Sequence, residues 1–261
     1  MNAPPELDIG SKVATALSLT MTGGFVDAVG YIALFEVFTA NMSGNSIHIG
    51  MYLAQRDWPN FLRPLCAVAS YVLGMLMTRI AIEIAGRVGY KRVASFTFAA
   101  EALLLAGFAH ARPAMHFGQL ANLHSPAYFA FVAMLAFAMG VQTATLTHVG
   151  ALTLYTTFVT GTLTKMTESI TRALFWIWDE LPHTGISHAV KNAGGQKDVR
   201  QAATLAATWT AYVVGAAAGV VVKARWELHA LYAPVAILCI FVVVDRLHPI
   251  GVQEEKHQTG S

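Results

Sequence analysis

The sequence predicts an all-α protein that crosses a membrane several times. Of its 261 residues, 55% are hydrophobic and only 12% are charged, whereas soluble domains carry about 25% charged residues. The mean hydropathy is positive, at +0.51. Apolar stretches of about 20 residues, enough for a helix to span a bilayer core, recur along the chain. We therefore expect a polytopic helical membrane protein with six to eight transmembrane helices, whose first partner is the lipid bilayer.

The composition also argues against several other classes of protein. The net charge is only +2 and no basic run occurs, so we expect no nucleic-acid partner. Cys66 and Cys239 lie in apolar segments and are interpreted as buried free thiols rather than a disulfide. No nucleophile elbow, phosphate loop, nucleotide fingerprint or zinc pattern is present. We expect neither an enzyme nor a resident cofactor or metal.

The first half of the membrane region is assigned to residues 13–110, after a polar leader at residues 1–12. The leader carries Glu6 and Asp8 and lacks the cationic start of a signal peptide, so the first helix should remain in the protein. Four segments follow, at about 13–34, 36–54, 65–86 and 93–110. The second segment is polar but, at about 19 residues, long enough to cross.

The second half is assigned to residues 127–245, after a connection at residues 111–126. Its segments lie at about 127–149, 152–176, 202–224 and 228–245. The most polar stretch of the chain, residues 179–201, separates the last two from the others and is expected to be an aqueous loop. A polar tail at residues 246–261 ends the sequence.

The two halves resemble each other, which predicts two four-segment repeats. Gly24 and Gly140 open corresponding stretches. Ser43-Gly44-Asn45 matches Thr160-Gly161-Thr162, and SYVLG at 70–74 matches AYVVG at 211–215. If both polar segments cross the membrane, the chain has eight passes and the repeats are parallel. If both dip in and return, it has six passes and the repeats are inverted. The positive-inside rule slightly favours six passes.

Asp27 is the most informative single residue, because it interrupts an apolar span. A carboxylate near the centre of a membrane helix costs about 2.5–3.5 kcal/mol on insertion scales, so it is usually retained for a purpose. One interpretation is a proton or cation coupling site. The other is a structural acid that accepts hydrogen bonds from a hydroxyl or backbone N–H in a packed interface.

A polar element follows Asp27 at residues 41–48. Asn41, Asn45 and His48 are spaced to share one face of a helix, and Ser43 and Gly44 lie off that face. We expect these five residues to line a substrate site, with hydrogen bonding between helices as the alternative.

The matching element of the second half adds a cation. Lys165 stands where His48 stands in the first half, which suggests an ion pair with Asp27 or a shared anion site, lined also by Thr160 and Thr162. Snorkelling of Lys165 to the membrane interface is the alternative. The counterpart of Asp27 is Thr143, so this half lacks the acid. Gln142 and His148 either line the cavity or pack, and Glu83 and Glu101 are interpreted as structural acids near span ends.

The run GGFVDAVGYI, with Asp27, followed by Asn41-Met42-Ser43-Gly44-Asn45, resembles the YoaK-like family of bacterial integral membrane proteins. The resemblance covers nearly the whole chain, although only these two motifs are specific. It implies a bacterial source and an inner-membrane location. The family has no established reaction, so the resemblance implies no catalytic activity.

Together these features favour a secondary transporter of a small polar solute or ion, coupled to protons through Asp27. The alternative is a non-transporting membrane scaffold or sensor, whose polar residues only join helices. The sequence does not identify the substrate, and it leaves a homo-oligomer open.

Overall fold

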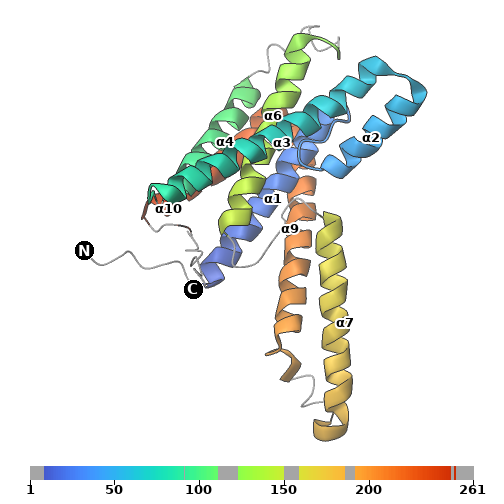
Figure 1. The fold of residues 1–261 in the computed structure, drawn as a ribbon, viewed down its shortest axis with the longest axis vertical. Helices are drawn as coiled ribbons and strands as arrows, with labels where there is room; N and C mark the ends of the chain where they lie inside the picture. Colours follow the sequence, from blue (N-terminus) through green and yellow to red (C-terminus); the bar gives the residue numbers. More distant parts are fainter. Residues whose placement is uncertain are drawn as a thin grey trace, which may run out of the picture.

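The computed structural model describes residues 9–90, 92–110, 123–149, 159–185, 192–247 and 250, and these parts are mostly helical. No β-strand occurs in these ranges, which confirms the predicted all-α class. The elements, shown in Figure 1, are α1 (Ile9–Ala33), α2 (Met42–Gln55), α3 (Trp58–Arg87), α4 (Val93–His110), α6 (Pro126–Val149), α7 (Val159–Thr184), α9 (Lys197–Trp226), the 3₁₀ turn η1 (Glu227–Leu231) and α10 (Tyr232–Leu247).

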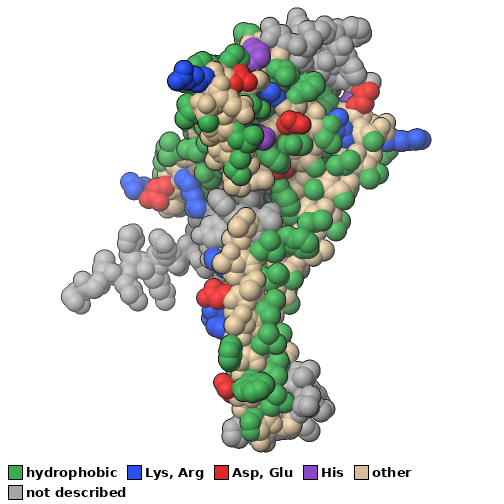
Figure 2. Space-filling model, turned by 90° about the vertical axis from the view of Figure 1, so that its right-hand side faces the viewer, with side chains coloured by type: hydrophobic (Ala, Val, Ile, Leu, Met, Phe, Trp, Pro, Cys, Tyr) green, Lys and Arg blue, Asp and Glu red, His purple; other side chains and the backbone are tan. Residues whose placement is uncertain are grey.

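Five helical stretches of the described residues are long and apolar enough to cross a membrane. They are Val13–Ala33, Trp58–Arg87, Val93–His110, Pro126–Leu146 and Lys197–Leu247, the last of which contains α9, η1 and α10. The exposed side of α3 is apolar and includes Val72, Leu73, Leu76, Met77, Ile80 and Ile84. Figure 2 shows hydrophobic side chains over much of one face, with charged side chains in separate small groups. Such a surface suits lipid rather than water, and the predicted polytopic membrane class is confirmed.

Two pairs of long helices cross closely, each with its members running in the same direction. In the α1–α9 pair, Gly215 lies against Met21 and Gly219 against Phe25. In the α3–α6 pair, Gly74 lies against Phe137, and the Cys66 Sγ is 3.7 Å from the Phe129 carbonyl oxygen. Small residues at these crossings let the backbones approach, as in many membrane helix pairs.

The remaining contacts show that the long helices alternate in direction along the chain. α1 and α6 are antiparallel, because Gln142 bonds to Leu19, whereas Leu135, which is earlier in α6, lies against Gly30, which is later in α1. α4 is antiparallel to α6, since Phe108 at its end contacts Phe131 at the start of α6. α4 is also antiparallel to α10, because Ser95 at its start bonds to Asp245 at the end of α10. The chain therefore passes through the molecule six times in alternating directions, through α1, α3, α4, α6, α9 and α10.

Helix α2 is shorter than the crossing segment expected at residues 36–54. Its 14 residues span about 21 Å at 1.5 Å per residue, less than the roughly 30 Å of a bilayer core. The expected segment is shortened because residues 34–41 are not helical. The α2 helix packs against α3 and forms a hairpin with it (Figure 1).

Helix α7 and the start of α9 reach further than the sequence indicated. α7 continues to Thr184 and α9 begins at Lys197, so both ends of the predicted aqueous loop 179–201 are helical. α7 packs along the N-terminal half of α9, away from α4 (Figure 1). Likewise, α1 begins at Ile9, inside the expected leader. Ile250 of the expected polar tail is buried, and its amide donates to Asp245.

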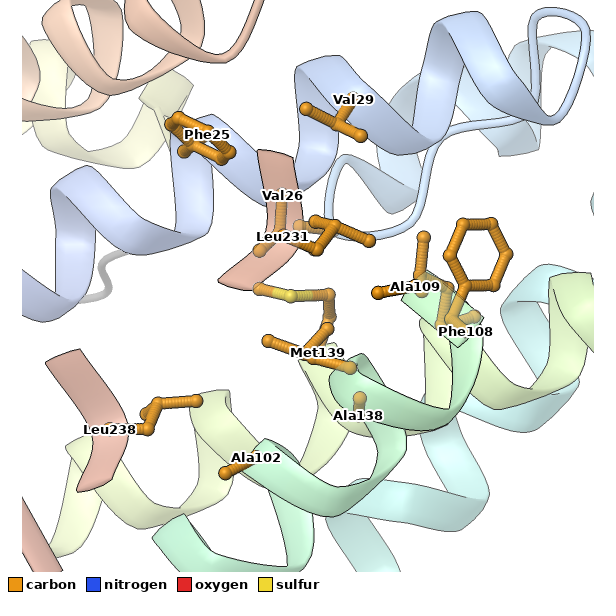
Figure 3. Close-up of a cluster of buried hydrophobic side chains, with 14 of the residues drawn as sticks. Phe25, Val26, Val29, Ala102, Phe108, Ala109, Ala138, Met139, Leu231 and Leu238 are labelled. Carbon is orange, nitrogen blue, oxygen red and sulfur yellow. The ribbon is translucent and has the colours of Figure 1, made fainter. Parts of the chain in front are cut away.

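The main core lies where α1, α4, α6, η1 and α10 meet. Figure 3 shows Val26 and Val29 of α1 beside Leu231 of η1, with Met139 of α6 below them. Both cysteines are free thiols, as predicted, but neither is fully buried, since Cys66 is half-buried and Cys239 is exposed. Its position on an outer face of a membrane helix matches contact with lipid.

Candidate functional site

Asp27 is buried on α1, 4% exposed, and both its carboxylate oxygens accept hydrogen bonds. Oδ1 accepts from the backbone amides of Thr39 and Ala40, both at 2.7 Å, and from the Thr39 hydroxyl at 3.1 Å. Oδ2 accepts from the Tyr212 hydroxyl of α9 at 2.7 Å. Four donors aimed at one side chain compensate the burial of an ionised carboxylate. Asp27 therefore joins α1, α9 and the segment that follows α1.

That segment, residues 34–41, is held at its other positions by side chains from three more helices, and we call it the anchored loop. Asn45 of α2 forms two bonds with the Phe38 backbone, accepting at 3.0 Å and donating at 2.8 Å. Tyr128 of α6 donates to the Leu34 carbonyl at 2.8 Å. Arg63 of α3 donates to the same carbonyl, to Phe35 and to the Tyr128 hydroxyl. Four helices thus contribute a side chain that bonds to this loop, and α9 contributes Tyr212, which bonds to Asp27.

The conformation of the anchored loop explains why so many contacts are needed. Phe35 and Glu36 have φ values of 51° and 69°, in the left-handed region that residues other than glycine rarely adopt. The loop then turns back along α1, so that Thr39 lies against Gly30, where a Cβ would come within 2.6 Å of its side chain. Strained backbone of this kind persists only where the surroundings determine it strongly.

The predicted polar element at residues 41–48 lies around this loop. Asn41 is the N-cap residue of α2 and does not lie on a helix face. Its side-chain oxygen accepts hydrogen bonds from the Gly44 amide and from the Ser43 hydroxyl, the latter at 2.7 Å. Gly44 leaves room for the Phe38 ring, against which the His48 ring packs at 6.4 Å between centroids. Asn45 is fully buried and bonded to Phe38. The five residues are brought together, but they bind their own loop.

The second-half residues are divided between two helices. On α6, the Gln142 amide nitrogen donates to the Leu19 carbonyl at 2.9 Å, and its Oε1 is buried without a partner. Thr143 accepts from the Tyr71 hydroxyl at 2.9 Å. His148 belongs to the last turns of α6, but its side chain lies outside the described residues. On α7, Thr160 is exposed, Thr162 is buried and Lys165 is half-buried.

The predicted pairing of Asp27 with Lys165 is not present between these two described residues. The carboxylate oxygens of Asp27 bond to the anchored loop and to Tyr212. Lys165 lies on α7, which makes its extensive contacts with α9 within the part of the chain that the structure describes. An open surface hollow of about 710 Å³ lies along α7 instead, lined by Thr160, Leu163, Thr164, Thr167, Glu168, Thr171 and Arg172.

Three residues with prominent roles were missed or undervalued by the sequence reasoning. Tyr212 and Tyr71 stand in the two matching motifs, AYVVG and SYVLG, which were used only to align the two halves of the sequence; the shared tyrosine was the available signal. Each hydroxyl bonds to one of the paired positions, Asp27 or Thr143. Arg63 has no comparable sequence signal, since it stands at the polar end of a span.

Glu101 also differs from its prediction as an acid near a span end. It is the ninth residue of the 18-residue helix α4 and is 0% exposed. Neither of its carboxyl oxygens has a hydrogen-bond partner. The sequence signal was a lone acid at the middle of a strongly apolar helix.

No metal centre is formed by the described residues, among which no three His, Cys, Asp or Glu side chains gather closely enough to hold an ion.

Comparison with known proteins gives a family without an assigned activity. The family model described as "Protein of unknown function (DUF1275)" matches residues 15–244. The chain is 28% identical over 163 residues to the "UPF0700 transmembrane protein YoaK" of Bacillus subtilis (strain 168), covering 62% of this chain and 69% of that protein. No solved structure matches the chain.

Proposed function

Because the chain belongs to the DUF1275 family and is a membrane protein with several apolar spans, we propose that it is a secondary transporter of a small polar solute or ion. The single observation that carries this proposal is the anchored loop. Non-helical backbone within a membrane protein is tolerated where it is buried in protein or lines a cavity. In transporters, helices broken by such segments form the substrate and coupling sites.

The geometry around Asp27 has the features of such a broken helix. The chain leaves α1, turns back towards Asp27, and enters the short helix α2 beyond Thr39 and Ala40. Backbone amides just before a helix start favour an anion. Asp27 accepts from two of these amides, in the place that an anionic group would take. Movement of this loop would therefore require Asp27 to exchange its partners, which couples the loop to α1 and α9.

The internal repeat is part of the proposal, and matching contacts support it. Gly24 faces the Tyr212 carbonyl, and Gly140 faces the Tyr71 carbonyl. Neither position has room for a side chain, because a Cβ atom there would lie 2.2 Å from the carbonyl oxygen. These are the residues that the two sequence halves align. α1 is antiparallel to its counterpart α6, so we propose inverted repeats with six passes, with α2 and α7 as the paired segments that do not cross.

The second half would supply the other side of the solute path. The hollow along α7 offers threonine hydroxyls and the Arg172–Glu168 pair, whose closest N–O distance is 2.7 Å. Hydroxyls and fixed charges suit a polar or ionic solute. Thr160 lies on this hollow, and we propose that Thr162 and Lys165 of the same helix complete the path together with Asp27, Asn41, Ser43, Asn45 and His48. Gln142, Thr143 and His148 of α6 would contribute to its inner part.

A non-transporting scaffold or sensor is the second candidate, and one observation favours it. Asp27, Asn41 and Asn45 are each used by groups of the protein itself, as expected where polar residues only join helices. For either role we propose no enzymatic activity. We also propose the bacterial cell (inner) membrane as its location, because multi-pass helical proteins reside there whereas spanning proteins of outer membranes are β-barrels.

The test is uptake into vesicles that contain the purified protein. Proteoliposomes are incubated with a mixture of small polar metabolites and salts, washed, and analysed by mass spectrometry and elemental analysis. We expect at least one solute to accumulate with the parent protein and not with a variant carrying Asn45→Ala, which releases the anchored loop. If the parent protein, inserted and folded, accumulates no solute above the content of protein-free vesicles, the scaffold is favoured.

A further inference from the structure

Glu101 has no role in the anchored loop or in the α7 hollow. We propose that Glu101 is a proton-binding site in the membrane interior, protonated in the packed state and able to release its proton when the helices around α4 separate. This inference deepens the proposed transport function, since it supplies the coupling ion and places it at Glu101 rather than Asp27.

Most side chains on the face of α4 that carries Glu101 are apolar, and the buried Thr97, one turn before it, donates its hydroxyl to the Ala94 carbonyl. Phe98, Leu105 and Phe108 recur at helical spacing around it, and all are 0% exposed. Its neighbour Ala102 lies in the core shown in Figure 3, with Ala138 of α6 and Leu238 of α10. A charged carboxylate here would lack any compensating donor, so the neutral, protonated carboxyl is the form that this environment tolerates.

Among the side chains that the structure describes, no counter-charge reaches Glu101 from the elements packed against α4, which are α3, α6, η1 and α10. Tyr71 bonds to Thr143, Tyr128 to Leu34, and Asp245 to Ser95. The other described titratable or charged groups on these elements and at the end of α4 are Arg63, Cys66, Arg79, Glu83, Arg87, His110, Glu227, His229, Tyr232, Cys239 and Arg246. None of them provides a hydrogen-bond partner to either Glu101 oxygen.

The same geometry favours a proton over a metal cation. Hard cations such as Na⁺ or Mg²⁺ take several oxygen ligands. Among the described residues, the buried side-chain oxygens without a partner are the two of Glu101 and Oε1 of Gln142. Gln142 also faces α1, where its amide bonds to Leu19. One carboxyl group can complete the binding of a proton but not of a metal ion.

Release of the proton requires movement of α4. Its first turn is tied to α10 by the Ser95 amide, which donates to Asp245 at 2.8 Å. Its last residue, His110, is bonded to the Tyr232 hydroxyl at 2.7 Å. With both ends fastened and Glu101 at 0% exposure, water reaches the carboxyl only when α4 separates from α6 or α10. The O–H bond then breaks and the proton passes to water, which links protonation to a conformational change.

Infrared spectroscopy of the full-length protein in lipid nanodiscs tests the site without reference to transport. We expect a carbonyl stretch of a protonated carboxylic acid at neutral pH, and a shift of this band after transfer to D₂O, which reports proton exchange. The band should be lost in Glu101→Gln, a near-isosteric change that preserves packing. It should be retained in the control Glu83→Gln, since Glu83 is an exposed acid paired with Arg87. A spectrum unchanged by Glu101→Gln, or a band that never shifts in D₂O, would overturn the proposal.

A second arm separates this proposal from the proposed function. If a solute is found that the parent protein accumulates, we expect an inward proton gradient to drive its uptake. We expect Glu101→Gln to abolish this gradient-driven uptake but to leave the exchange of solute across the vesicle membrane unchanged. Gradient-driven uptake that survives Glu101→Gln would remove the coupling role and leave transport standing. An infrared band lost in Glu101→Gln, with no solute moved by either protein, would instead support the proton site and count against transport.

Discussion

Three acids are buried among the described residues, and two of them, Asp27 in α1 and Glu101 in α4, lie within apolar stretches and have opposite surroundings. They are 4% and 0% exposed, and each stands alone in an apolar stretch. Asp27 accepts from four donors supplied by Thr39, Ala40 and Tyr212. Glu101 has no partner. The comparison teaches that burial alone does not define the role of an acid in a membrane, because the donors around it decide which protonation state is stable.

The largest expected effect comes from removing the charge of Asp27. Asp27→Asn leaves the amides of Thr39 and Ala40 facing a group that accepts fewer hydrogen bonds and brings two donors of its own. Each buried donor left unsatisfied costs about 1–3 kcal/mol, so we expect a loss of about 3 kcal/mol in the free energy of unfolding. Reversible unfolding in mixed micelles, followed by circular dichroism, measures this loss.

Glu101→Gln is the matched control, since it makes the same chemical change at the acid without donors. We expect its free energy of unfolding to change by less than about 1 kcal/mol, because a neutral amide replaces a neutral acid. Equal losses for the two variants would show that the two acids are held alike, contrary to the comparison.

Much of this fold could be predicted from the sequence, since its apolar spans and their order depend on composition and length. Where prediction failed, the cause was contact between distant segments. Residues 36–54 have enough residues to cross, yet α2 begins only at Met42 because Asn41 caps it and residues 34–41 are bonded to other helices. Arg63 and Tyr128, which fix that loop, lie 65 positions apart.

The sequence indicated some residues of this polar region but not their connections. Asp27, Asn41 and Asn45 do form one polar region, because their spacing follows from α1 and the start of α2. The partner chosen for Asp27 was Lys165, whereas the structure supplies Tyr212 from the motif of the other half. Spacing along one helix indicates which side chains share a face. It does not indicate which of two polar segments approaches that face, because this depends on how the helices cross.

The second prediction tests the comparison by replacing Glu101, the buried acid without hydrogen-bond donors. Glu101→Met places an apolar side chain of similar length in the core between α4, α6 and α10. Because it removes a buried polar group that has no partner, we expect the protein to gain about 1–2 kcal/mol in the free energy of unfolding. The same unfolding assay measures it. A loss of stability would indicate that Glu101 makes a favourable interaction.

The third prediction concerns the two tyrosines, which occupy matching positions on α9 and α3. Tyr212→Phe removes a donor to the carboxylate of Asp27, whereas Tyr71→Phe removes a donor to the neutral Thr143 hydroxyl. Hydrogen bonds to charged groups are the stronger, so we expect losses of about 1 kcal/mol for Tyr212→Phe and about 0.5 kcal/mol for Tyr71→Phe.

A double-mutant cycle assigns these losses to their partners. Tyr212→Phe should have almost no effect in an Asp27→Asn background, while Tyr71→Phe should keep its effect there. Additive losses for Tyr212→Phe and Asp27→Asn would mean that the 2.7 Å bond between these side chains does not contribute to stability.

An effect as small as that of Tyr71→Phe is expected from Thr39→Val, which removes only the longest of the four bonds to Asp27, at 3.1 Å. The backbone amides of residues 39 and 40 remain, and at 2.7 Å they are the shorter bonds. Because valine keeps the backbone amide, we expect a loss of only about 0.5 kcal/mol, measured in the same unfolding assay. A loss as large as that of Asp27→Asn would show that the Thr39 hydroxyl, rather than the backbone amides, provides most of the stability that the contact with Asp27 contributes. The anchored loop would then depend on the identity of residue 39, whereas the geometry indicates that it depends on the path of the backbone past Asp27.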